Sequence, residues 1–197
     1  MSQPNWKLIF SGTAQDELVR EVKTRARVIR QIGQGTLAII QTNADGSQET
    51  IAEYDALSGP QINGLLPDAH YHALPPVASN FLTEGEHPDK KGNEPTRLGY
   101  KMPLSYVADE DNVKRPFKRF ALLIHPVPGT EWVQKKYFPN NWTEGCIGLI
   151  GHAANEDFYK RMKDYFKKTK RKHIPLEVDV ESNANVRTQL GAREHYA

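Results

Sequence analysis

Cys146 is the only cysteine in the 197 residues of the chain, and it stands between a glycine and an apolar run. His125 lies upstream, at the end of another apolar run that begins at Phe120. Two buried strands could carry this cysteine and this histidine to neighbouring positions at one end of a sheet. Such a pair would supply a thiol nucleophile and its base.

The chemistry of the pair follows from proton transfer. A free cysteine has a pKa of about 8.5, so little of it is thiolate at neutral pH. A nearby histidine lowers that pKa by taking the proton, and it later returns the proton to a leaving amine. Gly145 leaves room for a substrate backbone, and the N–H groups around Gly145 and Cys146 could hold a developing oxyanion. The pattern therefore predicts acyl transfer or amide hydrolysis through a thioester.

The plain alternative is structural. A lone cysteine in an apolar run is often a small buried residue, and a lone histidine after such a run is often a loop residue. The residue pattern alone favours this alternative.

The spacing around Cys146 and His125 points the other way. His125 is followed by seventeen residues and then by Thr143-Glu144-Gly145-Cys146-Ile147. This pattern resembles the signature of the L,D-transpeptidase family: a His, a spacer of this size, Ser or Thr, a variable or His position, Gly-Cys and an aliphatic residue. The upstream Asp-Gly hairpin, the strand ending in Ile-His-Pro and the helix after the cysteine are similar too. The resemblance covers roughly residues 36–180.

The resemblance implies a β-sandwich-like catalytic domain that acts on peptidoglycan stem peptides. Cys146 would attack the carbonyl of the third, L-configured diamino residue and release the terminal D-amino acid. The acyl-enzyme would then pass to an amine, giving transpeptidation or D-amino-acid exchange, or to water, giving L,D-carboxypeptidase activity. His125 would be the base, oriented by the backbone carbonyl of the next residue, which Pro126 retains.

Two positions depart from the family pattern. Glu144 stands where His is common, which would alter the acid–base balance near the sulfur, and Gly148 stands where many members have Arg or Asn, which affects binding of a substrate carboxylate. Pro67-Asp68 also lacks the usual glycine. The departures indicate a divergent member, comparable with effectors delivered by type VI secretion and with phage-associated domains.

Other side chains are candidates for lining the site. The expected substrate-binding residues are Thr143, Glu144, Tyr71, Trp142 and Ile147. Tyr71 and Trp142 could equally be core aromatics, and Thr143 an ordinary turn residue.

Two histidines raise the question of a metal. His70 and His72 face the same side of one expected strand, and with His125 they suggest a metal site. A polar strand face or substrate-lining residues are the favoured interpretation, because no carboxylate completes a known ligand spacing. We expect neither a metal nor a cofactor.

Short strands separated by turns dominate the pattern around the site. We expect strands at residues 6–10, 36–42, 48–54, 67–74, 100–107, 117–125, 146–150 and 174–180, and long loops at 75–99 and 127–143. Asp45-Gly46 predicts a hairpin turn between the second and third of these strands. Residues 14–31 are ambiguous: apolar residues at helical spacing favour a helix from about residue 14, while residues 27–32 also fit a strand.

The pattern predicts a mainly β fold, an L,D-transpeptidase-like β-sandwich. It carries one C-terminal amphipathic helix at about residues 155–172, capped by Asn155, and an N-terminal helix is also favoured. We expect an N-terminal extension (1–35) packed on a catalytic domain (36–180), followed by a tail (181–197).

Charge and composition limit the partners. The net charge is +2 and the pI is about 8.5, because acids match most bases, so nucleic acid is not an expected partner. The basic face of the late helix is interpreted as a solvated surface. No stretch is long and apolar enough to span a membrane, and no secretory signal is seen at the N-terminus.

The expected partners are peptidoglycan stem peptides, with an immunity protein or a secretion-system component as further partners of an antibacterial effector or lytic enzyme. We expect synthesis in a bacterial cytoplasm and action in the periplasm or cell wall of a target after type VI or other non-classical delivery. Two alternatives stay open: a cell-wall-binding module with impaired catalysis, and a phage or secretion structural protein that uses this fold as a scaffold.

Overall fold

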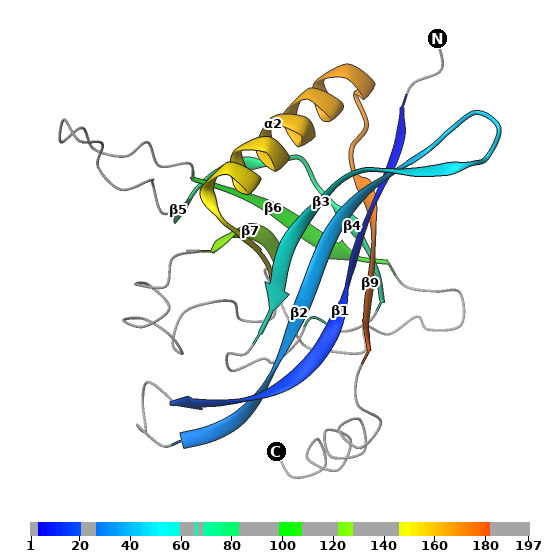
Figure 1. Cartoon of the computed structure of the whole chain (residues 1–197). Coiled ribbons are helices and arrows are strands. Elements are labelled where there is room, and N and C mark those ends of the chain that lie inside the picture. The colour runs from blue at the N-terminus through cyan, green and yellow to red at the C-terminus, as the bar shows by residue number, and fades with distance from the viewer. Residues whose placement is uncertain are drawn as a thin grey trace.

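The structure is a computed structural model that describes most strands and the late helix. The described residues are 4–20, 27–59, 66, 69–82, 99–107, 122–127 and 146–181, without the side chains of 15–20, 27–31, 80–82 and 181. This part of the chain is mainly β with a single helix, which confirms the predicted class (Figure 1).

Within the described residues, nine strands form one sheet. The strands are β1 (Asn5–Arg20), β2 (Arg27–Thr42), β3 (Gln48–Ser58), β4 (Ala69–Ala73), β5 (Val77–Leu82), β6 (Gly99–Tyr106), β7 (Leu123–Val127), β8 (Ile147–Ile150) and β9 (Ile174–Glu181). Their order is β4-β9-β1-β2-β3-β8-β7-β6-β5, and β6 pairs with β4 as well. All strands except β5 therefore lie in a ring of continuous pairing.

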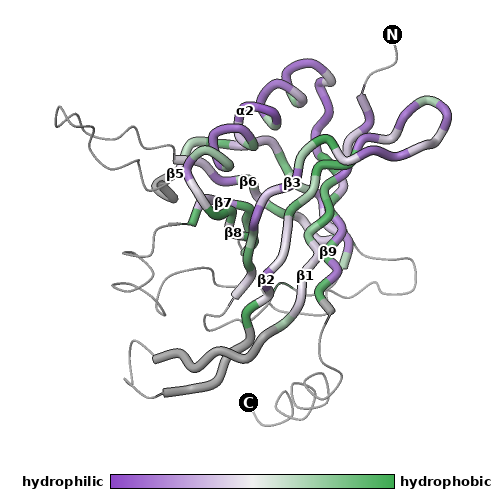
Figure 2. The backbone as a smooth tube through the Cα atoms, in the orientation of Figure 1, coloured by the Kyte–Doolittle hydropathy of each residue, from purple (hydrophilic) through white to green (hydrophobic). Residues whose placement is uncertain are grey.

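The ring has an inner and an outer face, because side chains alternate along each strand. The inner face carries the main core, to which residues such as Leu8, Leu37, Ile124 and Leu176 contribute fully buried side chains. Figure 2 shows the resulting alternation of hydrophobic and hydrophilic positions along the strands. A smaller apolar group, Ile32, Leu57 and Val127 with Ile150 packed against it, forms a separate cluster.

Helix α2 (His152–Thr169) follows β8 and packs on the main core. Its expected apolar stripe is confirmed, since Phe158, Met162, Tyr165 and Phe166 are all buried. The Tyr165 ring stacks on Trp6 at the start of β1, with ring centroids 4.6 Å apart. The hydroxyl of Tyr54 in β3 donates to Asp157 at 2.7 Å. The helix is thereby attached to two strands, β1 and β3, that precede it by about a hundred residues or more.

The expected cap of this helix is wrong. The residue before the helix is Gly151, at φ 88°, and no side chain caps the first turn. Asn155 is instead fully buried inside the first turn, where its amide bonds to backbone carbonyls.

The helix favoured from about residue 14 is also wrong, and the strand alternative for residues 27–32 is correct. β1 and β2 pair antiparallel along their whole length, from Asn5 opposite Thr42 to Arg20 opposite Arg27. Pairing with a long neighbouring strand satisfies every second backbone group, and this tertiary contribution outweighs the helical spacing of a few apolar residues.

The remaining expectations can be compared strand by strand. The Asp45-Gly46 hairpin is confirmed: Gly46 lies at φ 84° and donates its N–H to Asn43 O at 3.0 Å. The expected loop at 75–99 contains a strand, β5, in its first part, while 83–98 lie outside the described residues. Val127 and Glu181, the first residues of the expected loop at 127–143 and of the expected tail at 181–197, belong to β7 and β9, and the rest of both segments lies outside the described residues. Residues 5–20 and 27–35 belong to the same sheet as the strands that follow.

One close approach fixes the β1–β2 pairing. Gly12 and Gly35 face each other across the two strands. A Cβ on Gly35 would overlap the carbonyl of Ser11, and one on Gly12 would overlap the carbonyl of Gln34. Only glycine fits at either position.

We predict that Gly35→Ala lowers the free energy of unfolding by more than about 3 kcal/mol, because backbone must move to admit the methyl group. Gly46→Ala is the control, since a Cβ there meets nothing within 4 Å and only the positive φ opposes it. That change should cost about 1 kcal/mol. Urea unfolding measures both, and equal losses would contradict the close approach.

Candidate functional site

His125 lies in β7, a strand whose five residues are all buried. Its Nδ1 is 2.8 Å from the carbonyl oxygen of Pro126. A carbonyl only accepts hydrogen bonds, so Nδ1 carries the proton and Nε2 of the neutral ring is the basic nitrogen. The orientation expected for the base, through the carbonyl that follows it, is therefore present in the structure.

Burial sets the charge of the imidazole. His125 is 4% exposed, and this burial lowers its pKa below the usual 6.5, although the hydrogen bond to Pro126 acts in the opposite direction. The ring is consequently neutral at pH 7, which is the form that can accept a proton.

Cys146 immediately precedes β8, the strand that pairs in parallel with β7. The register sets Ile124 opposite Ile147 and His125 opposite Gly148. Counting back along the alternation from Gly148, Cys146 falls on the same face as His125, as its diagonal neighbour on the adjoining strand. The register thus sets the cysteine and histidine selected from the sequence on adjoining strands, and both are buried.

The face that holds the pair is the outer one. Ile124, Ile147 and Leu149 point into the main core, whereas Val127 and Ile150 belong to the small separate cluster. Alternation assigns His125 to the side of Val127 and Cys146 to the side of Ile150. The pair is therefore bordered by aliphatic side chains on the outer wall of the ring.

Gly148 is the direct cross-strand partner of His125. Because glycine has no side chain, no group from this position lies beside the imidazole on the shared face. The sequence marks Gly148 as a departure from the L,D-transpeptidase pattern that the chain resembles, but only the register shows that this position lies opposite His125.

The expected substrate-binding residues are not all in this region. Ile147 and Tyr71 are directed into the main core, on the other face of the sheet, and Tyr71 packs edge-on against Tyr106. Gly145, Thr143, Glu144 and Trp142 lie outside the described residues.

The junction between β8 and α2 contains a polar contact that the sequence did not reveal. Asn155 donates from Nδ2 to Leu149 O at 3.0 Å and to Gly151 O at 2.7 Å, and its Oδ1 accepts from the Tyr100 hydroxyl at 2.7 Å. These bonds connect β6, the end of β8 and the first turn of α2. Burial raises the pKa of Tyr100 well above 10.0, so the hydroxyl keeps the proton that it donates.

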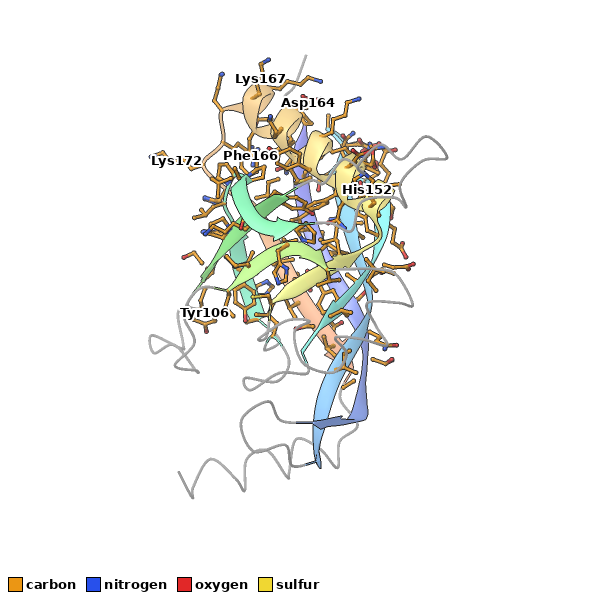
Figure 3. The ribbon with its side chains drawn as sticks, turned by 90° about the vertical axis from the view of Figure 1, so that its left-hand side faces the viewer. Tyr106, His152, Asp164, Phe166, Lys167 and Lys172 are labelled. Carbon is orange, nitrogen blue, oxygen red and sulfur yellow. The ribbon has the colours of Figure 1, made fainter. Side chains whose placement is uncertain are left out.

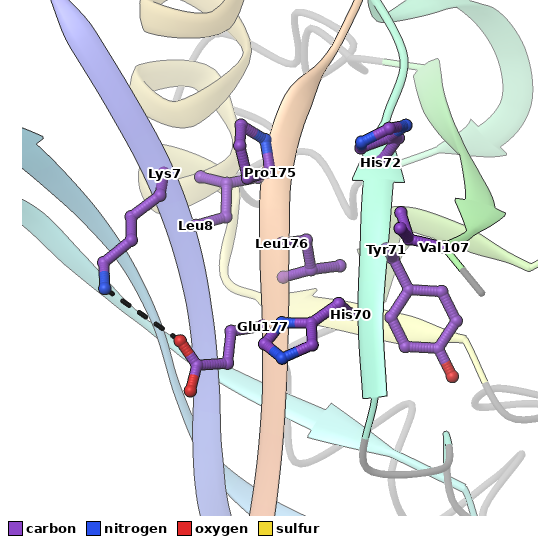
Figure 4. A pocket seen from close by; sticks show the side chains of 9 residues that line it. All are labelled: Lys7, Leu8, His70, Tyr71, His72, Val107, Pro175, Leu176 and Glu177. Carbon is purple, nitrogen blue, oxygen red and sulfur yellow. Dashed lines mark ion pairs between the residues drawn. The ribbon is translucent and has the colours of Figure 1, made fainter. Parts of the chain in front are cut away.

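The two histidines of β4 lie elsewhere. His70 and His72 line a hollow of about 290 Å³ on the outer face of β1, β9 and β4, together with the Lys7–Glu177 ion pair (3.9 Å) (Figure 4). The His72 ring stacks on His173 at 3.6 Å between centroids. In the order of strands around the ring, β9 and β8 are on opposite sides, so this hollow and the Cys146–His125 pair occupy different walls.

The described residues contain no group of three or more His, Cys, Asp or Glu arranged to hold a metal ion. In the part of the chain that the structure describes, no helix has the length and hydropathy that crossing a membrane requires. No family model matches the chain, and neither a curated protein nor a solved structure matches it.

The neutral state of His125 predicts a pH dependence of stability. Because the pKa of the folded state is lowered, the contribution of His125 is complete above about pH 6.5 and is lost as the pH falls from there through the folded pKa. The difference in unfolding free energy between wild type and His125→Gln should therefore shrink between pH 7.5 and pH 5. Urea unfolding across this range measures it, and a constant difference would contradict the buried neutral ring.

The Asn155 contacts predict a second stability effect. Asn155→Leu leaves the Tyr100 hydroxyl and the Leu149 carbonyl without these partners, at a cost of about 2–4 kcal/mol. Adding Tyr100→Phe removes the hydroxyl that Asn155→Leu leaves without its partner. The double variant should therefore lose less unfolding free energy than the sum of the losses in the two single variants. Asp164→Ala, at an exposed position of α2, is the control and should stay within about 0.5 kcal/mol of wild type. Additive losses would show that the two side chains are not coupled.

Proposed function

We propose that the chain is a cysteine acyltransferase or peptidase that acts on peptidoglycan stem peptides through a thioester on Cys146. The reaction class is L,D-transpeptidation, L,D-carboxypeptidation or D-amino-acid exchange. The observation that carries the proposal is the hydrogen bond from His125 Nδ1 to Pro126 O, on a strand directly paired with the one that Cys146 opens. The substrate class comes from the resemblance of the His…Thr-Glu-Gly-Cys-Ile spacing to L,D-transpeptidases.

The proposed reaction begins with transfer of the Sγ proton to His125 Nε2. The thiolate then attacks the amide carbonyl, the carbon–sulfur bond forms, and His125 returns the proton to the amine as the carbon–nitrogen bond breaks. Water or an acceptor amine attacks the thioester, gives up a proton to His125, and releases the sulfur as thiolate. The carbonyl of Pro126 has the role of keeping Nε2 directed at the reacting groups.

Gly148 motivates a second candidate, a cell-wall-binding module with impaired catalysis. The position opposite His125 lacks a side chain that could bind a substrate carboxylate. Such a module would bind peptidoglycan but leave its peptides unchanged.

The decisive experiment incubates wild type and Cys146→Ala with tetrapeptide muropeptides and follows the products by mass spectrometry. Wild type should release the terminal D-amino acid, or exchange it when a second D-amino acid is added. Cys146→Ala should reduce the rate by at least about a thousandfold, because no other group replaces the nucleophile. His125→Gln should reduce it by about 10²- to 10⁴-fold.

His72→Gln is the matched control, since it removes a histidine from β4, a strand that pairs with neither β7 nor β8, and it should leave the products unchanged. Iodoacetamide provides an independent measurement, because Cys146 is the only cysteine in the chain. Rapid labelling at about pH 7 that slows in His125→Gln is expected for an activated thiol. Identical muropeptide products from wild type and Cys146→Ala would refute the enzyme, and binding without conversion would identify the module instead.

A further inference from the structure

The second half of α2 and the turn after it carry a concentration of positive charge that the proposed reaction does not use. Residues 160–172 contain eight Lys or Arg and one acid, Asp164, so this segment has a charge of +7. The remaining 18 basic and 23 acidic residues leave the rest of the chain at −5. The near-neutral total therefore conceals an uneven distribution of charge along the sequence.

Seven of these basic side chains are exposed, and we refer to them together as the basic face. They are Lys160, Lys163, Lys167, Lys168, Lys170, Arg171 and Lys172. Figure 3 shows Lys167 and Lys172 directed away from the sheet, whereas Phe166 lies between the helix and the strands. Arg161 is not included, because its Nε bonds to Asp157 at 2.7 Å.

The backbone at Lys170 is a second, independent observation. Lys170 has φ 55°, and it is the only residue other than glycine with a positive φ in the described part of the chain. This C-terminal position of a helix ordinarily favours glycine or asparagine, because a side chain strains the left-handed conformation. Lysine at this position costs conformational strain that glycine would avoid, which indicates that its positive charge has a function.

The composition of the basic face indicates its ligand. The one large hydrophobic residue exposed in the described residues is Val77, on β5, so α2 offers no apolar side chain for insertion into lipid. The ring of Tyr159 is partly buried and covered by Lys163 Nζ at 5.3 Å, which leaves no open aromatic for stacking on bases. Six of the seven cations are ammonium groups, which act as point charges rather than as planar forks. A row of such charges suits a flexible chain of regularly spaced anions.

We propose that the basic face binds an anionic cell-wall polymer with repeating phosphodiester groups. The choice of a cell-wall polymer rests on the proposed function, whereas the anionic character rests on the basic face alone. Only Gly151 separates β8 from α2. A polymer held on α2 would therefore keep the enzyme on the wall through the element that directly follows β8 in the chain.

The test measures binding of a fluorescent poly(glycerol phosphate) chain of defined length to the full-length protein by anisotropy. The test variant, Lys163→Gln/Lys167→Gln, removes two positive charges from α2. The matched control, Lys7→Gln/Lys101→Gln, removes two positive charges from strands β1 and β6. The α2 variant should bind about tenfold more weakly and flatten the dependence on salt between about 50 and 200 mM. The strand variant should change affinity less than about twofold. Neither substituted α2 lysine lies in the core, and thermal unfolding of both variants checks that they remain folded.

Equal weakening by the two variants would overturn the proposal, because binding would then follow net charge rather than this face. Tighter binding to a DNA duplex or to phosphatidylglycerol vesicles than to the polymer, at the same salt, would overturn the choice of ligand. Cys146→Ala must bind as wild type does, so that binding is measured apart from catalysis. Inactivity on muropeptides with polymer binding intact would reject the enzyme and leave the basic face as the wall-binding element.

Discussion

The double pairing of β4, with β9 on one edge and with β6 on the other, is the constraint on which the rest of the structure depends. It converts a row of strands into a ring, so that each strand of the ring has partners on both edges and its register is fixed. β8 is the shortest strand, yet β3 and β7 hold it from both sides. The positions of Cys146 and His125 follow from that register. Helix α2, which follows β8 after Gly151, packs against β1 and β3.

Local patterns in the sequence predicted much of this fold. The hairpin at Asp45-Gly46 and the apolar stripe of α2 depend on residues close together in the chain, and both predictions were correct. The assignment of residues 14–31 failed because its outcome depends on pairing with a distant segment, which helical spacing cannot reveal. Asn155 has the usual type for a helix cap, but a buried hydroxyl on β6 and a carbonyl on β8 bind it instead.

The candidate site divides in the same way. The runs ending in Ile-His-Pro and beginning with Gly-Cys-Ile sufficed to predict two neighbouring buried strands. Whether His125 and Cys146 share a face depends on the register of the parallel strands. A shift of one residue would move one of the two side chains to the other face, and no local pattern in the sequence determines the register. The same register directs Ile147 into the core and places Gly148 opposite His125, although both were selected from the sequence for other reasons.

The parallel pairing of β1 with β9 has a consequence for how the chain reaches this structure. Leu8 pairs with Leu176, and β9 makes two of the pairings that complete the ring, so both pairings form only after β9 has been synthesised. Contacts of such long sequence separation carry a large loop-closure entropy and make folding slow. Until β9 arrives, β1 and β4 each present an unpaired edge, a state that is prone to aggregation and is a natural substrate for chaperones. The ring is thus completed only when β9 is available to pair with both β1 and β4.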